Sequence, residues 1–580
     1  MKKYKVWLCA ALASVLVLSA SVGCSQGNHA QEFYYDDGIV ADGANYNTAQ
    51  FFRNDLEVDW YADPDAIYIT EGEDAGWFFV YATTGNGGGF AIYRTKDFSS
   101  WEPIGFADMK TDKDGWVTTD VWAPEVIYMN GKYWMYFSAC AKDKGAKVHY
   151  LGVAVSDSPR GPFELYESDS SNFYGETAVK SKPPIVFEDH FDEMRAAGWK
   201  ISSTATNFSV IDASPFLDEN GDLYLYFVPF DSSNENNALT SKSFICGMKM
   251  RDPVTPDYST VTPLVAAQYD SFKKVDGMWT GVGDTGLDVV NEAPFMMRHT
   301  TQHADGTTTT KYYLTYANNG YTSPYYQVRT AISDSPLGTF ENDPANPTHG
   351  IANGFNHMSG TAHHAIVEAG DEMFIFYHAH VKRNMGESNP RALGVDRVVW
   401  CYDETLGCDR LHSNGPTYSL CPLPNATTGR KNLATNAVMS ATNAVSGRST
   451  NLLRDGAVPI HSHSDGLEFR ANDSTTITIT LKKKSEVSAL FVYNSYLFGN
   501  AFDKVDKITL VGDGKTYVIN DLTFNPAYYD AQLEYIRPGA AAVAAFGEPL
   551  TVSTIKIEIS SKIAGSGVIG IGDIAIMGVQ

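Results

Sequence analysis

Between residues 51 and 424, apolar and aromatic residues occur in short runs interrupted by Gly, Asn and Asp, and no long segment has a period of 3.6 residues. Such runs predict β-strands, with a short helix in an inserted loop at 191–199 as the main exception. Five times, a polar residue heads a first strand and a turn leads into an aromatic second strand. The second strands are expected in GWFFVYAT from residue 76, GKYWMYFSA from 131, GDLYLYFVP from 221, KYYLTYAN from 311 and DEMFIFYHA from 371.

Five copies of one multi-strand unit predict a five-bladed β-propeller over residues 51–424, because such units bury their faces on each other around an axis. The nearly identical segments SDSPRGPFE from residue 156 and SDSPLGTFE from 333 support the repeat. A single large sandwich would not explain five copies. A Pro-, Asn- and Thr-rich stretch at 416–436 predicts a linker, and alternation with period two predicts a β-sandwich (jelly-roll) module over 430–580. The predicted fold class is all-β.

The first 24 residues have a basic start and an apolar run that is too short to span a membrane, which is typical of a secretory signal peptide. Its end, SVGC, resembles a bacterial lipobox, so Cys24 is the residue expected to be lipidated. Acyl chains on Cys24 would hold the protein at a membrane, with residues 25–50 as a tether. We therefore expect an exported, membrane-anchored lipoprotein on the outer membrane, facing the periplasm or the cell surface.

Charge and cysteine content exclude several classes of protein. The net charge of -24 argues against a nucleic-acid partner. Five cysteines follow Cys24, and five is an odd number without paired CxxC spacing. Neither a disulfide framework nor a zinc site is therefore indicated.

The polar residues that head the first strands are the candidates for chemistry, because these strands begin near the axis of a propeller and converge there. In chain order they are Asp63 and Asp65, Asp120 and Trp122, Asp212, Glu292, and His363 and His364. Hydrolysis of a glycosidic bond needs one protonated carboxyl group and one carboxylate, whose mutual repulsion separates their pKa values. The pattern therefore indicates a glycoside hydrolase or a sugar-binding propeller.

Five ordered motifs carry a resemblance to a known family: ADPDAIY, DVWAPEVIY, IDASPFLDENGDLYLYF, NEAPF and SGTAHHAIV. Over residues 51–415 the chain resembles glycoside hydrolase family 43, a family of five-bladed propellers with an inverting mechanism. The resemblance implies that Asp63 is the general base and Glu292 the general acid. It implies that Asp212 raises the pKa of the acid and orients it.

The same resemblance assigns three substrate-binding residues. Trp122 would form the apolar wall of the sugar pocket, His363 would lie near the axis beside a calcium or water site, and Arg391 in RALGVDRVVW would contact sugar hydroxyls. No cofactor is expected to be required, and structural Ca²⁺ at the axis is the one metal considered. Spacing alone does not distinguish Asp63 from Asp65; the motif favours Asp63.

The 430–580 module resembles discoidin-like, galactose-binding-like modules, which often bind carbohydrate. Together these features predict an exo-acting α-L-arabinofuranosidase or β-xylosidase that acts on plant-type polysaccharide or oligosaccharide. The alternatives are an endo-arabinanase or β-galactan hydrolase of the same family, or a non-catalytic glycan-binding lipoprotein.

Overall fold

The computed structural model describes residues 31–33, 51–54, 61–84, 87–110, 115–141, 148–166, 168–169, 181–229, 242–350, 359–380, 391–417, 419–524, 539–563, 565 and 567–580. The predicted signal peptide and Cys24 lie outside these residues. In the described part of the chain, no helix has both the length and the apolar character needed to cross a membrane.

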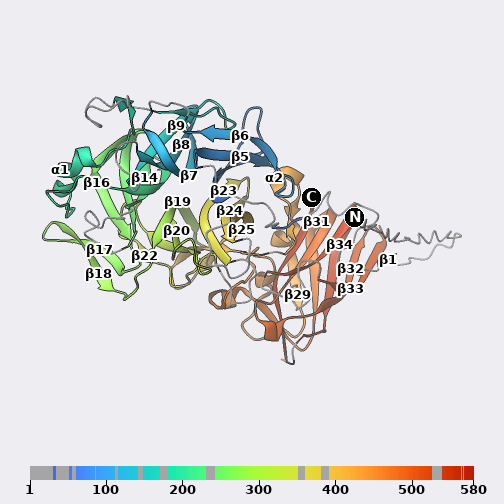
Figure 1. Ribbon diagram of the computed structural model, residues 1–580. Coiled ribbons are helices and arrows are strands. Elements are labelled where there is room, and N and C mark those ends of the chain that lie inside the picture. The colour runs from blue at the N-terminus through green and yellow to red at the C-terminus, as the bar shows by residue number, and fades with distance from the viewer. Residues whose placement is uncertain are drawn as a thin grey trace, which may run out of the picture.

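Five antiparallel units of four strands each confirm the predicted propeller (Figure 1). Blades one and two contain β3 (Ala62–Tyr68), β4 (Phe78–Thr83), β5 (Gly89–Thr95) and β6 (Glu102–Asp108), then β7 (Val117–Met129), β8 (Lys132–Ala141), β9 (His149–Ser156) and β10 (Glu164–Leu165). Blade three contains β13 (Val210–Leu217), β14 (Leu223–Pro229), β15 (Ile245–Asp252) and β16 (Thr255–Val265). Blades four and five contain β19 (Asn291–Gln302), β20 (Thr308–Asn318), β21 (Gln327–Ser333) and β22 (Glu341–Asn342), then β23 (Ser359–Ala369), β24 (Glu372–His380), β25 (Arg391–Asp403) and β26 (Cys408–Ser413).

The first strands of the blades form a closed ring, because each contacts the first strand of the next blade and β23 of blade five contacts β3 of blade one. The aromatic second strands lie between layers and are fully buried in β4 and β14. Closure is reinforced where the chain enters the propeller: β2 (Phe51–Phe52) pairs with β27 (Cys421–Pro422). Asn54 accepts a hydrogen bond from the Val395 amide of blade five at 2.7 Å. The predicted helix is α1 (Phe191–Ala196).

The register of the first strand against the second shifts once in β3, β13 and β19, twice in β23 and three times in β7. One of these shifts occurs at the equivalent place in all five blades and is called the bulge. A non-glycine residue with φ near +50° occupies every bulge, a region of the Ramachandran map that is costly for most side chains. These residues are Asp63 (48°), Ala123 (49°), Asp212 (56°), Ala293 (50°) and His363 (49°). The five blades therefore present one local backbone geometry with different side chains.

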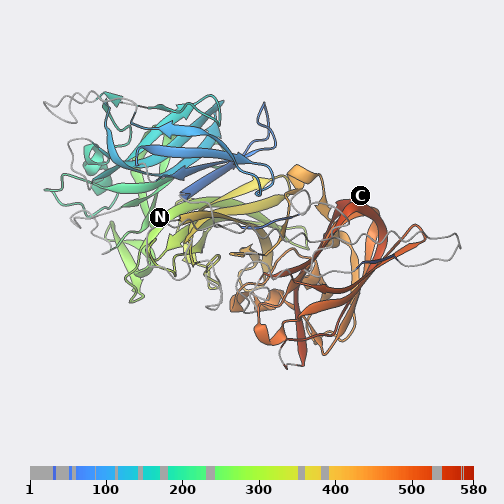
Figure 2. The same ribbon diagram turned by 45° about the vertical axis from the view of Figure 1, so that its right-hand side comes forward.

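The C-terminal part forms one nine-stranded, sandwich-like sheet, as predicted, with the path β1-β33-β32-β34-β31-β35-β28 (Figure 2). Its strands are β1 (Gln31–Phe33), β28 (Lys431–Asn432), β29 (Val438–Ala441), β30 (Phe469–Asn472), β31 (Thr475–Asn494), β32 (Lys504–Gly512), β33 (Lys515–Thr523), β34 (Ala541–Ile559) and β35 (Val568–Val579). Residues 31–33, within the predicted tether, thus pair with β33 of the module.

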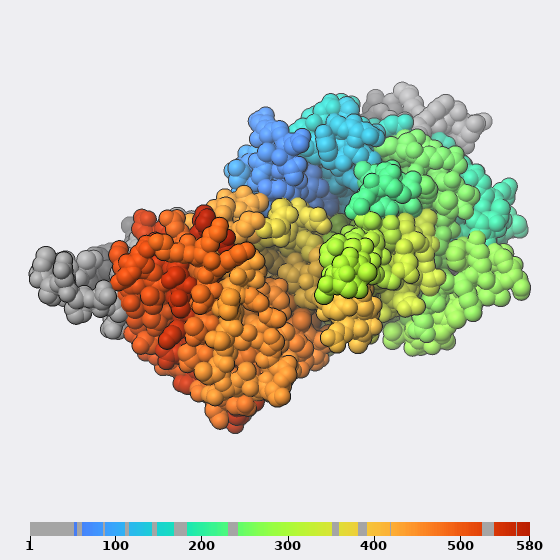
Figure 3. All heavy atoms as spheres, turned by 180° about the vertical axis from the view of Figure 1, so that it is seen from behind, coloured from blue at the N-terminus to red at the C-terminus, as the bar shows by residue number. Residues whose placement is uncertain are grey.

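Blade five and the linker join the two parts. In Figure 3 their yellow to light-orange residues lie between the other propeller blades and the orange to red module. The side-chain amide of Asn414 makes two hydrogen bonds across this junction, each 2.9 Å long. Its nitrogen donates to the Gly456 carbonyl, and its oxygen accepts from the Val458 backbone amide. His412 lies 2.9 Å from the Val458 carbonyl.

Candidate active site

The bulges bring the three predicted acids to the same end of the ring. Asp63 and Asp212 occupy the bulge positions of blades one and three. Glu292 precedes the bulge of blade four, which is the position that Trp122 takes in blade two. Two structurally equivalent positions per blade therefore carry four of the predicted residues, and His363 occupies the bulge of blade five.

In blades one to four the backbone amide of the bulge residue donates to a side chain of the preceding blade, and this bond fixes the first strand against its neighbour. The acceptor in three cases lies at one equivalent position of the second strand, opposite the residue before the bulge. These bonds run from Asp63 to His378 Nδ1 (3.1 Å), from Ala123 to Thr83 Oγ1 (2.9 Å) and from Asp212 to Ser138 Oγ (2.9 Å).

Blade three lacks a side-chain acceptor at this position of its second strand. The equivalent residue of its second strand is Val228, which has no side-chain acceptor. The amide of Ala293 donates instead to Oδ2 of Asp212, at 2.9 Å. Because Glu292 precedes Ala293 directly, this bond ties the Asp212 carboxylate to the residue next to the predicted acid.

Asp63 is surrounded by cationic and hydrogen-bonding groups. Arg391 Nη1 donates to its Oδ1 at 2.9 Å, and Nδ1 of His363 lies 3.3 Å from the same oxygen. Burial on its own would raise the pKa of Asp63, but Arg391, His363 and a hydrogen bond from Thr83 outweigh it, and the pKa lies below the ordinary 3.8. Asp63 is therefore ionised at neutral pH.

Glu292 has the opposite environment. Burial, with the negative charge of Asp63, raises its pKa to about 7, although the Tyr326 hydroxyl donates to its Oε1 at 2.8 Å and lowers it in part. Burial likewise raises the pKa of Asp212 to about 7; the charges of Glu292 and Asp63 add to this effect, and His363 opposes it. The three carboxyl groups therefore act on one another within a single site.

This arrangement separates a proton acceptor from a proton donor. Asp63 is a carboxylate held ionised by a guanidinium group, and Glu292 is a carboxylic acid that keeps its proton up to near-neutral pH. Two carboxyl groups with pKa values displaced in opposite directions are what general base and general acid catalysis require.

The other predicted residues each make contacts of their own. Trp122 is half-buried, and its indole stacks on the imidazole of His149, with ring centroids 4.6 Å apart. Nε2 of His364 lies 2.7 Å from the hydroxyl oxygen of Thr315 in blade four, so its ring bonds a neighbouring blade. Asp65 accepts from the Val126 amide of blade two at 2.8 Å, so it joins two blades.

A calcium ion beside His363 would need six to eight oxygen ligands. The acidic oxygen described against its ring belongs to Asp63, which is bonded to Arg391, and the other neighbour is the imidazole of His378. Among the described side chains this environment is rich in nitrogen, and the contacts around His363 do not form a calcium-type ligand set. The calcium ion stays a prediction.

Three site residues were not predicted. Tyr326 lies directly before β21, His378 lies near the end of the second strand of blade five, and Thr83 is the last residue of the second strand of blade one. Their contacts with Glu292 and Asp63 arise from strand register and from packing between blades, and neither has a signature in a single sequence. The equivalent positions of Thr83, Ser138 and His378 in three of the five second strands could have indicated Thr83 and His378, but not Tyr326.

Comparison with known proteins gives the following similarities. The profile described as glycosyl hydrolases family 43 matches residues 58–171 and 194–406. "Xylosidase/arabinosidase 43A" of Humicola insolens is 32% identical over 113 residues, which cover 18% of this chain and 34% of that protein. "Probable arabinan endo-1,5-alpha-L-arabinosidase C" of Aspergillus clavatus is 32% identical over 128 residues, which cover 21% and 35%. A solved structure of a thermostable family-43 glycoside hydrolase aligns with a TM-score of 0.47 at 24% identity, over 64% of this chain and 99% of that one.

The chain thus spans about a third of the length of these two curated relatives. The family match is far more extensive, because it covers more than half of the 580 residues and contains the first strands of all five blades. On this match, with the propeller and its three acids in place, the chain belongs to glycosyl hydrolases family 43.

Proposed function

We propose that the protein is an inverting glycoside hydrolase in which Asp63 activates water and Glu292 protonates the leaving oxygen. The observation that carries this proposal is the opposite displacement of their pKa values within one site. An inverting reaction needs both groups at once, on opposite faces of the sugar ring, with space for a water molecule. Asp212 would help to keep the proton on Glu292, since negative charge on both carboxyl groups at once is unfavourable within one site.

Within this class we propose exo-acting hydrolysis of α-L-arabinofuranosides or β-xylosides of plant-type polysaccharide. The name of the Humicola relative combines these two activities, and that of the Aspergillus relative supports endo-arabinanase as the alternative. β-Galactan hydrolysis is the other alternative within the family.

A panel of aryl arabinofuranoside, xyloside and galactoside, with linear arabinan beside it, tests this proposal. We expect release of the aryl group from the arabinofuranoside or the xyloside, and proton NMR should show the product anomer of inverted configuration first. Faster cleavage of internal arabinan bonds would favour the endo alternative. The original configuration appearing first would contradict inversion, and binding without turnover on every substrate would favour a glycan-binding protein.

The pKa values predict an asymmetric pH profile for kcat/KM. Activity should fall as the pH rises through about 7, where Glu292 and Asp212 lose their protons. On the acid side it should persist to about pH 4, because the pKa of Asp63 lies below its ordinary 3.8.

The free energy of unfolding should also fall toward alkaline pH. Glu292 and Asp212 have raised pKa values in the folded state, so the stability they contribute is lost as the pH rises through about 7. Circular dichroism at each pH separates the two effects. An alkaline limb that is absent, or that coincides with unfolding, would contradict the assignment of Glu292.

We further propose that Cys24 carries a lipid anchor and that the C-terminal module binds carbohydrate and holds the propeller near its substrate. The lipobox-like SVGC supports the anchor, and the discoidin-like sequence pattern supports the module's role. Labelling with a palmitate analogue, compared between the natural protein and Cys24→Ser, tests the anchor; equal labelling would exclude it.

A further inference from the structure

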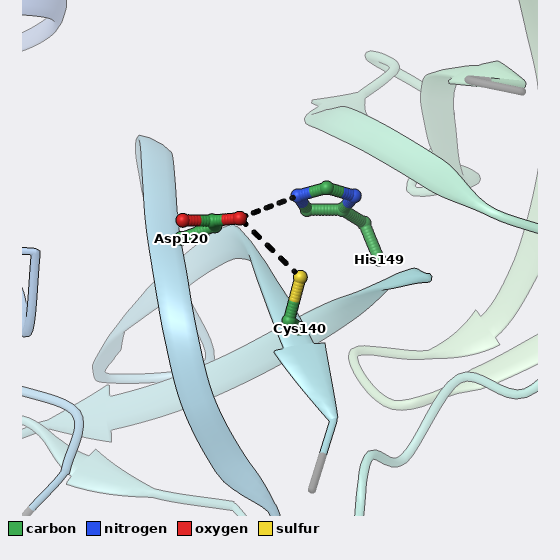
Figure 4. A group of neighbouring side chains, drawn as sticks. All are labelled: Asp120, Cys140 and His149. Carbon is green, nitrogen blue, oxygen red and sulfur yellow. Dashed lines mark hydrogen bonds and ion pairs between the residues drawn. The ribbon is translucent and has the colours of Figure 1, made fainter. Parts of the chain in front are cut away.

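A second cluster of reactive side chains lies in blade two, where its histidine, His149, stacks on Trp122. Strand register brings it together: Cys140 of β8 is paired with His149 of β9, and Thr119, the neighbour of Asp120, is paired with Cys140. One carboxylate, one thiol and one imidazole from three adjacent strands therefore meet at the same end of the blade (Figure 4).

The separations of the ligand atoms suit a small cation. Oδ2 of Asp120 lies 3.6 Å from Sγ of Cys140 and 3.7 Å from Nε2 of His149, and all three atoms lie within 4.8 Å of one another. Around a tetrahedral zinc ion with bonds of about 2.0–2.3 Å, neighbouring ligand atoms are about 3.3–3.7 Å apart. Both separations from Asp120 have these dimensions, and the third, between Cys140 and His149, is at most 4.8 Å.

The local structure holds the three donors in place. Asp120 has φ +54°, which turns it out of the regular strand, and the Thr119 hydroxyl donates to its other oxygen, Oδ1, at 3.1 Å. Cys140 is fully buried and His149 is 3% exposed, whereas the side chain of Asp120 is 34% exposed. The exposed side of Asp120 gives an ion a way in and leaves a fourth coordination position for water or another ligand.

We infer that Asp120, Cys140 and His149 form a binding site for a thiophilic divalent cation, with Zn²⁺ as the expected ion. A thiolate, an imidazole and a carboxylate select zinc over calcium or magnesium, which prefer oxygen ligands. On binding, Cys140 releases its proton to solvent and the thiolate takes its place at the ion. Burial and the charge of Asp120 raise the pKa of the Cys140 thiol to about 12, so the cation is what makes this deprotonation favourable.

The site would act on the sugar wall through His149. The imidazole of His149 stacks on the Trp122 indole, so an ion on its other edge would fix the ring pair in one orientation. Metal binding here neither requires nor replaces the hydrolysis proposed above, because none of the three ligands belongs to the group of Asp63, Asp212 and Glu292. Cysteine spacing gave no sign of this site, since the ligands are contributed by register and not by a CxxC motif.

Co²⁺ serves as a spectroscopic probe for the site in the reduced, metal-free full-length protein. We expect about one equivalent to bind, with a near-ultraviolet sulfur-to-cobalt charge-transfer band and the visible bands of tetrahedral cobalt, both displaced by Zn²⁺. Cys140→Ser should abolish the charge-transfer band. Cys246→Ser, which alters another fully buried cysteine, in blade three, should leave the band unchanged.

Zinc should raise the unfolding midpoint of the natural protein and of Cys246→Ser, but not that of Cys140→Ser. If Cys140→Ser fails to fold, Asp120→Asn gives the same comparison at a partly exposed position, with zinc affinity expected to fall more than about 100-fold, which exceeds the usual cost of losing an outer-shell partner. A cobalt spectrum without sulfur charge transfer, a band that survives in Cys140→Ser, or zinc binding no tighter than calcium binding would each overturn the proposal.

Discussion

Glu292→Gln is expected to lower kcat on natural glycosides by about 10²–10⁴-fold, the usual contribution of a general acid. Glutamine has the same shape and still accepts the hydrogen bond from Tyr326, but it has no proton to give to the leaving oxygen. Aryl glycosides with strongly acidic leaving groups need little protonation, so they should recover most of their rate. The measurement is kcat across a series of leaving groups, compared between the variant and the natural enzyme.

Two further measurements make the Glu292 prediction specific. The alkaline limb of the pH profile near pH 7 should shift or disappear, because the Glu292 carboxyl group, whose pKa is about 7, has been removed. Glu341→Gln, at an exposed position of β22, should change neither the rate nor the profile. A uniform loss across all leaving groups would instead mean that the substitution disturbs the site as a whole, and Glu292 would not be the acid.

Asp63→Asn is expected to cost a similar factor of about 10²–10⁴ in kcat, but with the opposite dependence on the substrate. The amide cannot accept a proton from the attacking water, so no leaving group should restore the rate. In Asp63→Ala, azide should restore turnover and give a glycosyl azide of inverted configuration, since azide attacks without losing a proton. Arg391 loses its carboxylate partner in both variants, so thermal unfolding must be measured beside kcat.

Asp65→Asn is the matched control, because it changes the second acid of the same motif. Its side-chain oxygen would still accept from the Val126 amide, so the joint between blades one and two is preserved. We expect kcat to stay within about tenfold of the natural value, well short of the loss of a general base. If Asp65→Asn lost as much activity as Asp63→Asn, the base could not be assigned to Asp63 alone.

The propeller could be predicted because its repeat is written in short, local patterns. Second strands such as β4 and β14 are buried along their whole length, so they appear as continuous aromatic runs. The acids Asp63, Asp212 and Glu292 could be predicted because each stands at the head of such a unit. The alternation of apolar and polar residues that predicted the module is clear at the start of β31, where buried and less buried positions alternate.

The remaining features of the site depend on contacts between blades. Tyr326 reaches Glu292 across 34 residues, and His378 reaches Asp63 across 315, through the register of strands that a single sequence does not encode locally. The same applies to Arg391, which was expected to contact sugar hydroxyls: in the structure its described bond is to Asp63. A role in holding the base ionised cannot be deduced from the position of an arginine in a strand.

The recurring bulge has a consequence for how such enzymes acquire new activities. Each blade offers the same pair of side-chain positions, or sockets, one on the strained residue and one just before it. In blades one to three the strained amide bonds a second-strand side chain of the neighbouring blade, so an acid, an indole or an imidazole can be exchanged in these sockets without loss of that bond. Asp212 is the exception, because its own carboxylate is the acceptor for the strained amide of blade four. Substrate specificity can therefore change by substitution in one blade at a time, as long as the preceding blade keeps an acceptor for the strained amide.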